Sequence, residues 1–252
     1  MQYRRLGRTE LMVAEVGAGT GALPSDGEAA VETLRAAIDA GCSLIEFAVN
    51  DEVATSAIAE AMQRQRLHVL LVATGSGDVA ELEAALERLG VPSVDLYLLD
   101  AGSATALPAL REGELTRFAG IAANDAEQAL AAIEGGEADV VQWPYHLGAV
   151  DAVDAELVLA AAAAADVALI GCSPLAGGEL LRGPSAEAVD SLCTGAPQTP
   201  AQAAIAWALS DPRLAAVIVG SRSADQAQEN AAASDVAALP QSELDRVAEL
   251  LS

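Results

Sequence analysis

Acidic side chains stand at or just after short apolar segments that have the composition of buried β-strands. Glu46, Asp51 and Asp100 are three such carboxylates, and His146, one of two histidines, follows another apolar segment. If these segments are neighbouring parallel strands, the carboxylates lie close together and cannot all ionise without cost, so the pKa of at least one should rise. A carboxyl group with a raised pKa can donate a proton near neutral pH. We therefore predict that these four residues are catalytic.

Such a set of groups suits reactions that move protons and need no hydride, namely dehydration, β-elimination, isomerisation or cyclisation. One alternative is an acidic rim exposed to solvent, because the chain has 37 acidic residues, and the histidine could simply be held by a backbone carbonyl. A Mg²⁺ or Mn²⁺ site ranks second, because the carboxylates follow no metal-binding motif. A Schiff-base mechanism is excluded at the side-chain level, because the sequence contains no lysine.

Other side chains near the same segment ends are candidates for substrate binding. Gln142, Trp143 and Tyr145 come just before His146, and a later apolar segment ends at Cys172. Because the cysteine has no evident base or cation beside it, a role as a small packed residue is favoured over a role as nucleophile. We predict that these four side chains contact the substrate and that the histidine assists as a proton shuttle.

The elements that must position these residues alternate regularly along the chain. Runs rich in Val, Ile and Leu alternate with longer Ala-, Leu- and Glu-rich stretches of helical period, which is typical of repeated β-strand–α-helix units. Eight units predict a single (β/α)₈ barrel domain over residues 1–252, with its site on the loops at the C-terminal ends of the strands. The predicted strands are 13–18, 43–47, 68–74, 94–99, 117–121, 139–143, 167–172 and 215–219.

Capping residues and the two ends of the chain complete this prediction. Ser25 with Glu28 has the pattern of a helix capping box, and Thr199 precedes a proline at the first position of another helix. Residues 2–6 could pair with part of the first strand as a hairpin that closes the bottom of the barrel. Residues 241–251 are predicted to form a terminal helix.

Composition limits the partners that we expect. The net charge of −24 repels phosphate backbones and anionic lipids, so nucleic acid and membrane partners are not expected. The three cysteines form no CxxC pair, and their odd number fits reduced thiols better than disulfides. The N-terminal residues form no apolar signal segment, and no apolar run is long enough to span a membrane. A cytoplasmic location is expected.

Six stretches, spread in order over nearly the whole sequence, carry a recognisable pattern. They are YRRLGRTELMVAEVGAGT from Tyr3, LRAAIDAGCSLIE from Leu34, LGVPSVDLYLLD from Leu89, ADVVQWPYHL from Ala138, CSPLAGG from Cys172 and GSRSADQAQEN from Gly220. In this order they resemble the aldo-keto reductase family. The resemblance implies a barrel enzyme that reduces carbonyl groups with NADPH through a tyrosine, a lysine, an aspartate and a histidine.

Matching motif to motif, this sequence departs from the family at all four catalytic positions. The aspartate falls on Glu46, the tyrosine on or near Asp51, the lysine on Gly75 and the histidine on Asp100. A phenol beside an ammonium can protonate a developing alkoxide, whereas ionised carboxylates would repel it. The comparison with the family motif therefore disfavours carbonyl reduction.

The two ends of the implied cofactor site match the family's motifs to different degrees. At the nicotinamide end the family's Ser-Asn pair falls on Ala122 and Ala123 and its stacking tyrosine on Cys172, while Gln142 is kept. The adenosine end matches closely, and Ser223 would cap a helix whose N-terminus favours an anion. The alternative is inherited loop structure without a ligand. The implied NADP(H)-binding residues are Gly220, Ser221, Arg222, Gln226, Glu229 and Asn230.

The leading prediction is a cofactor-independent enzyme of lyase or isomerase type on an aldo-keto reductase barrel, acting on a small molecule. The alternatives are an NADPH-dependent reductase with an atypical site and a non-catalytic binding or regulatory barrel. Segments 100–114 and 178–198 are shorter than the family's usual loops, which predicts an open site that accepts a bulky or polycyclic substrate.

Overall fold

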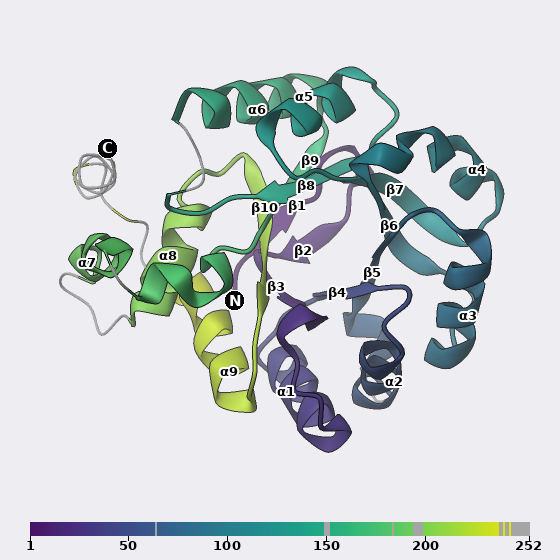
Figure 1. Cartoon of the computed structure of the whole chain (residues 1–252), viewed down its shortest axis with the longest axis horizontal. Helices are drawn as coiled ribbons and strands as arrows, with labels where there is room; N and C mark the ends of the chain where they lie inside the picture. The colour runs from purple at the N-terminus through teal and green to yellow at the C-terminus, as the bar shows by residue number, and fades with distance from the viewer. Residues whose placement is uncertain are drawn as a thin grey trace.

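Eight parallel strands close into a barrel in the computed structural model, and helices surround it (Figure 1). The structure describes residues 1–63, 65–148, 152–182, 184–193, 199–236, 239 and 242. The strand order around the barrel is β10-β3-β4-β5-β6-β7-β8-β9, as the repeated units predicted. The barrel strands are β3 (Val16–Gly19), β4 (Leu44–Ala48), β5 (Leu70–Gly75), β6 (Val94–Asp100), β7 (Thr116–Ala122), β8 (Val140–Pro144), β9 (Ala168–Cys172) and β10 (Leu214–Gly220).

The first predicted strand, 13–18, is in fact two strands with different partners. β1 (Tyr3–Arg5) pairs antiparallel with β2 (Met12–Ala14), whereas β3 pairs parallel with β4 and β10. The hairpin expected from residues 2–6 is therefore confirmed. The other seven predicted strands are confirmed with shifts of one or two residues at their ends.

The helices lie outside the barrel, and apolar side chains fill the layer between them and the strands. This layer relies on small residues, as an alanine-rich composition requires. Within the described part of the chain, no helix is long and apolar enough to cross a membrane. The helices are α1 (Gly27–Asp39), α2 (Glu52–Ala61), α3 (Val79–Leu89), α4 (Leu107–Glu112), α5 (Ala126–Glu134), α6 (Ala152–Ala165), α7 (Pro184–Ser191), α8 (Pro200–Leu209) and α9 (Ala224–Ala232).

Polar side chains cap the N-termini of several helices, and at α1 the capping residue differs from the one predicted. The Asp26 side chain, and not that of Ser25, caps α1 by accepting a hydrogen bond of 2.9 Å from the backbone N–H of Ala29. Both are good cap residues, but only the aspartate stands immediately before the helix. Thr199 caps α8 with Pro200 at the first helical position, as predicted, and Gln202 completes a capping box that the sequence analysis did not predict. Almost all of the predicted terminal helix, 241–251, lies outside the described residues.

Alternation along the strands decides which side chains face the barrel interior. The interior cluster contains Leu44, Leu96, Val140 and Ile170, and their immediate neighbours in each strand pack against the helices instead. Successive side chains of a strand point to opposite faces. Positions two residues beyond these interior side chains therefore also face inward, toward the C-terminal mouth of the barrel.

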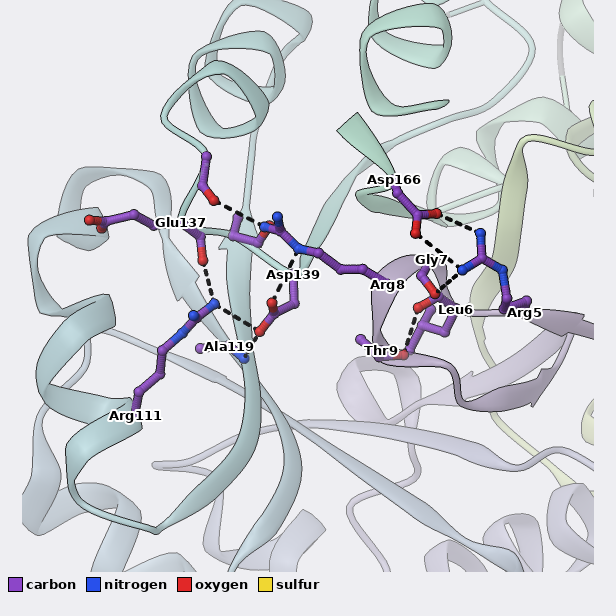
Figure 2. A network of polar contacts seen from close by, with 12 residues as sticks. Arg5, Leu6, Gly7, Arg8, Thr9, Arg111, Ala119, Glu137, Asp139 and Asp166 are labelled. Atoms are coloured by element: carbon purple, nitrogen blue, oxygen red, sulfur yellow. Dashed lines mark hydrogen bonds and ion pairs between the residues drawn. The ribbon is translucent and has the colours of Figure 1, made fainter. Parts of the chain in front are cut away.

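Arginine–carboxylate pairs fasten the opposite, N-terminal end of the barrel (Figure 2). Asp139 forms ion pairs with Arg8 at 3.3 Å and with Arg111 at 2.9 Å, and Asp166 forms one with Arg5 at 2.5 Å. Arg8 and Arg111 also donate to backbone carbonyls of the segment that precedes β8. The contacts of Arg5 with Asp166 and of Arg8 with Gly136 join residues 161 and 128 positions apart, whereas those of Arg111 join residues 26 and 28 positions apart. All of them lie away from the C-terminal mouth, which is free for a site.

Candidate active site

A cleft of about 690 Å³ lies at the C-terminal mouth of the barrel, where the fold predicts a site. It runs from the ends of β3, β4, β9 and β10 across the loop after β9 to α9. Its lining residues are Gly19, Gly21, Ala22, Glu46, Cys172, Ser173, Pro174, Leu175, Gly177, Gly178, Leu181, Arg182, Ala186, Asp190, Pro200, Ala201, Ile218, Val219, Gly220, Arg222, Gln226, Glu229 and Asn230.

Glu46 is an inward-facing carboxyl group in this cleft. It lies two residues after Leu44 of the interior cluster, while its neighbour Phe47 packs outward. Its Oε1 accepts a hydrogen bond of 3.3 Å from Nε2 of Gln142, which faces inward from β8 by the same alternation. Burial raises the pKa of Glu46, and the hydrogen bond from Gln142 partly opposes this. The side chain therefore keeps its proton to a higher pH than an exposed glutamate does.

Small residues make room for the Glu46 carboxyl group. A Cβ atom at Gly19 would lie 3.2 Å from Oε2 of Glu46, and Cys172 lines the cleft nearby. Burial, with a further contribution from the Glu46 charge, raises the pKa of the Cys172 thiol to about 12. The cysteine is therefore a neutral thiol at physiological pH, as expected for a packed residue, because the thiolate is the nucleophilic form.

The residues matched to the adenosine end form an organised wall of the cleft. Ser223 caps α9, and the backbone N–H of Arg222 donates to Oε1 of Gln226 at 2.9 Å. Nδ2 of Asn230 donates to Oγ of Ser221 at 3.0 Å, and both side chains are buried. Ser221 therefore supports this wall from behind, whereas the cleft is lined by the other five predicted residues, Gly220, Arg222, Gln226, Glu229 and Asn230.

The arginines of the cleft differ from those elsewhere in the molecule. Nine arginines, on several elements, form ion pairs with carboxylates. Among the described residues, Arg182 and Arg222 are the two arginines that form no ion pair, and both line the cleft. In a chain with 37 acidic residues, two guanidinium groups that form no ion pair with any described residue are thus available to bind an anion at this place. Sequence analysis missed Arg182, although it stands as a lone cation after strand 167–172.

Glu46 is the one predicted catalytic residue among the residues that line the described cleft. Asp51 caps α2, where its side chain accepts a hydrogen bond of 2.9 Å from the backbone N–H of Ala54. Asp100 ends β6 with an exposed side chain, and Nδ1 of His146 lies 2.9 Å from the carbonyl oxygen of Leu147. Within the described residues, no three His, Cys, Asp or Glu side chains are grouped so that they could hold a metal ion. The structure therefore does not bring the four predicted residues together around the cleft.

Two of the predicted substrate-binding side chains point away from the cleft. Trp143 and Tyr145 are 3% and 6% exposed and belong to the core cluster between barrel and helices. Their ring centroids are 5.7 Å apart, and Tyr145 also stacks on Trp207 of α8 at 5.4 Å. The alternation that turns Gln142 inward turns Trp143 outward. Gln142 contacts the site through Glu46, and Cys172 lines the cleft directly.

Gly75, matched to the lysine position, has no space for a side chain. A Cβ atom there would lie 2.7 Å from Oη of Tyr97 and 2.8 Å from Cγ2 of Val49. The phenol of Tyr97 instead accepts a hydrogen bond of 3.2 Å from the backbone N–H of Gly77. The packing around β5 is thus built around a glycine at this position.

Comparison with known proteins places the chain in a family. The model of the aldo/keto reductase family matches residues 15–252. The chain belongs to the aldo/keto reductase family. Its structure is similar to an aldo-keto reductase from Bacillus halodurans in its holo form, with a TM-score of 0.85 and 20% identity over 99% of this chain and 96% of that chain. No curated protein matches the sequence.

Two solved structures from Klebsiella pneumoniae also resemble this aldo/keto reductase family member. One is an aldo/keto reductase in complex with NADP and acetate, with a TM-score of 0.84 and 24% identity over 100% of this chain and 96% of that chain. The other is an aldo-keto reductase in complex with NADPH, with a TM-score of 0.82 and 23% identity over the same shares. The prediction of a cofactor-independent lyase or isomerase is therefore wrong. These findings favour the alternative of a reductase.

Proposed function

We propose that this protein is an NADP(H)-dependent oxidoreductase with an atypical active site. The observation that carries the proposal is the pair of arginines, Arg182 and Arg222, which lack ion-pair partners among the described residues and line one cleft. NADP(H) carries a pyrophosphate and a 2′-phosphate, which are the anions that planar guanidinium groups bind best. The reductases from Klebsiella pneumoniae, which contain NADP or NADPH, support the same cofactor.

The residues at the adenosine end fit this cofactor. Arg222 precedes α9, whose N-terminal N–H groups and helix dipole favour an anion beside the guanidinium group. Asn230 and Gln226 line the same wall and are held by hydrogen bonds before any ligand binds. Arg182, on the other side of the cleft after β9, would hold the pyrophosphate. A site organised in advance loses less entropy when it binds.

The residues at the inner end of the cleft, where the barrel strands end, would hold the nicotinamide mainly by shape. Gln142 is buried and donates to Glu46, so one of its amide N–H groups is already occupied. Ala122 and Ala123 carry no polar side chain, and the Cys172 thiol is neutral. When bound, NADPH supplies a hydride to an electrophilic carbon. Glu46 contributes the ionisable group beside the reacting carbon.

Titration of the protein with NADPH, followed by the change in NADPH fluorescence, tests the proposal. We expect saturable binding that weakens about ten- to a hundred-fold in Arg222→Ala, because charge-assisted hydrogen bonds contribute about 1.5–3 kcal/mol. Arg182→Ala should weaken the binding of both NADPH and NADH, because both carry the pyrophosphate. Arg222→Ala should weaken NADPH far more than NADH, because Arg222 would hold the 2′-phosphate, which NADH lacks.

Arg35→Ala is the matched control, since it also removes one guanidinium group but from an ion pair with Glu60 outside the cleft. It should leave NADPH affinity unchanged. If the wild type shows no saturable binding, or if all three arginine variants bind NADPH like the wild type, the proposed cofactor is wrong.

A further inference from the structure

The charges at the inner end of the cleft are unusual for a site that reduces carbonyl groups. Of the cleft-lining residues that lie on the barrel strands, Glu46 is the one with a carboxyl group, and among the described residues it forms no ion pair. The chain has no lysine, and its three tyrosines lie elsewhere: Tyr3 is exposed on the β1–β2 hairpin, and Tyr97 and Tyr145 pack outside the barrel strands. No phenol or ammonium group is therefore at hand beside Glu46.

A carboxylate at the inner end of the cleft disfavours negative charge on the reacting group and favours positive charge on it. Reduction of a carbonyl group places negative charge on oxygen, which an ionised Glu46 would destabilise. A positively charged reacting centre would instead be stabilised by Glu46, and the attraction is stronger in a partly buried site than in water. The net charge of −24 acts in the same direction by drawing cations toward the protein.

The geometry around Glu46 leaves one carboxylate oxygen for a ligand. Gln142 holds Oε1 by its hydrogen bond, and Oε2 has no hydrogen-bond partner among the described residues. Oε2 faces the small residue Gly19, where a side chain would come within 3.2 Å of it. Glu46 is half-buried, and a carboxylate that is partly removed from water without a cationic partner is destabilised, so a bound cation would stabilise it.

We propose that Glu46 binds a substrate cation, and that the substrate class is an iminium ion, a C=N⁺ group. The inference rests on the proposed NADP(H) dependence. In the overall balance the carbon of C=N⁺ gains a hydride from a dihydronicotinamide, and the π electron pair moves to nitrogen. The products are a neutral amine and a nicotinamide cation. No proton is taken from the protein, so no tyrosine or lysine acid is needed.

Binding of a permanent cation to the cofactor-free protein tests the role of Glu46 without any turnover. The probe is N-methyl-dihydroisoquinolinium, with its neutral carbon analogue methyl-dihydronaphthalene as the ligand control, both measured by calorimetry. Wild type should bind the cation more tightly than the neutral analogue. Glu46→Gln keeps the oxygen that accepts from Gln142, and it should weaken the cation about ten- to a hundred-fold while leaving the neutral analogue unchanged.

Glu83→Gln is the matched protein control, because it removes one negative charge from an exposed position on α3 and should not alter either affinity. If Glu46→Gln binds the cation as the wild type does, or weakens both ligands equally, the cation site is refuted. Circular dichroism of each variant confirms that it is folded.

Turnover of the two substrate types tests the reaction itself. With NADPH, wild type should reduce the iminium probe in preference to benzaldehyde, and Glu46→Gln should remove that preference. Faster reduction of benzaldehyde by wild type would overturn the assignment of substrate class. Failure of NADPH to bind would refute the proposed function alone, since the calorimetry of the cofactor-free protein still decides whether Glu46 binds cations.

Discussion

Replacing Glu46 with glutamine should stabilise the protein at alkaline pH and leave its stability nearly unchanged at acidic pH. Burial raises the pKa of Glu46 in the folded state, so the folded protein holds this proton to a higher pH than the unfolded chain does. Wild type therefore loses stability as the pH rises from the ordinary glutamate pKa through the raised pKa. Below the ordinary value the carboxyl group is protonated in both states, and the difference from glutamine vanishes.

The size of the effect follows from the contacts of the carboxyl group. Above the raised pKa, wild type holds a half-buried carboxylate whose Oε2 has no hydrogen-bond partner among the described residues, which costs about 1 kcal/mol, the lower end of the range for an unsatisfied group. Glutamine keeps the acceptor for Gln142 and carries no charge. For a domain of this size, each kcal/mol corresponds to about 2–4 °C in Tm.

Thermal melts of wild type and Glu46→Gln, followed by circular dichroism from about pH 4 to about pH 9, measure this linkage. The difference between the two proteins is the useful quantity, because the other 36 acidic residues titrate in both. Glu83→Gln, exposed on α3, should show a small difference that does not depend on pH. A difference between wild type and Glu46→Gln that stays flat across the range, or that favours wild type at alkaline pH, would refute the buried carboxyl group.

Three further predictions concern the packing around the site. Gly75→Ala should cost about 1–3 kcal/mol of folding free energy by overpacking. The cost should be smaller in a Tyr97→Phe background, which lacks the oxygen that would lie 2.7 Å from the new Cβ atom. Chemical denaturation of the wild type, the two single variants and the double variant measures the difference. Asp26→Ala should cost about 0.5–2 kcal/mol in the same assay through loss of the α1 cap, whereas Ser25→Ala should cost little. Cys172 should react slowly with iodoacetamide near neutral pH, because its thiol pKa is raised to about 12, and labelling followed by mass spectrometry should show the rate climbing as the pH rises toward that value.

The sequence predicted the barrel well because each strand–helix unit is visible in a short stretch of sequence and the unit is repeated along the chain. Each strand is a short apolar run between helical stretches, so its position is clear even where its ends shift by a residue or two. The exception is 13–18, where one apolar run contains two strands with different partners on either side of Glu15. Pairing partners are a long-range property, and local composition does not contain it.

Single residues of the site were harder to predict because one position along a strand reverses the direction of a side chain. Gln142 and Trp143 are neighbours in β8, yet the first faces Glu46 and the second packs against the helices. Asp51 follows β4 as predicted, but a helix starts at the next residue and uses its carboxylate as a cap. An aspartate in that position satisfies a backbone N–H, which competes with any role in the cleft.

The sequence also does not show which arginines form ion pairs. Arg5, Arg8 and Arg213 find carboxylate partners up to 161 positions away, so sequence does not show which arginines remain unpaired. Only the folded chain distinguishes Arg182 and Arg222 from the nine other arginines that the structure describes, and it places both in the cleft that also contains Glu46. Asp190 and Glu229 line the cleft together with these two arginines, and Glu46 lies at the barrel strands with no ion-pair partner among the described residues. A nucleotide with its phosphates on the arginines, followed by a reacting centre of positive charge, is complementary to both ends. A carbonyl substrate is complementary to the outer end alone.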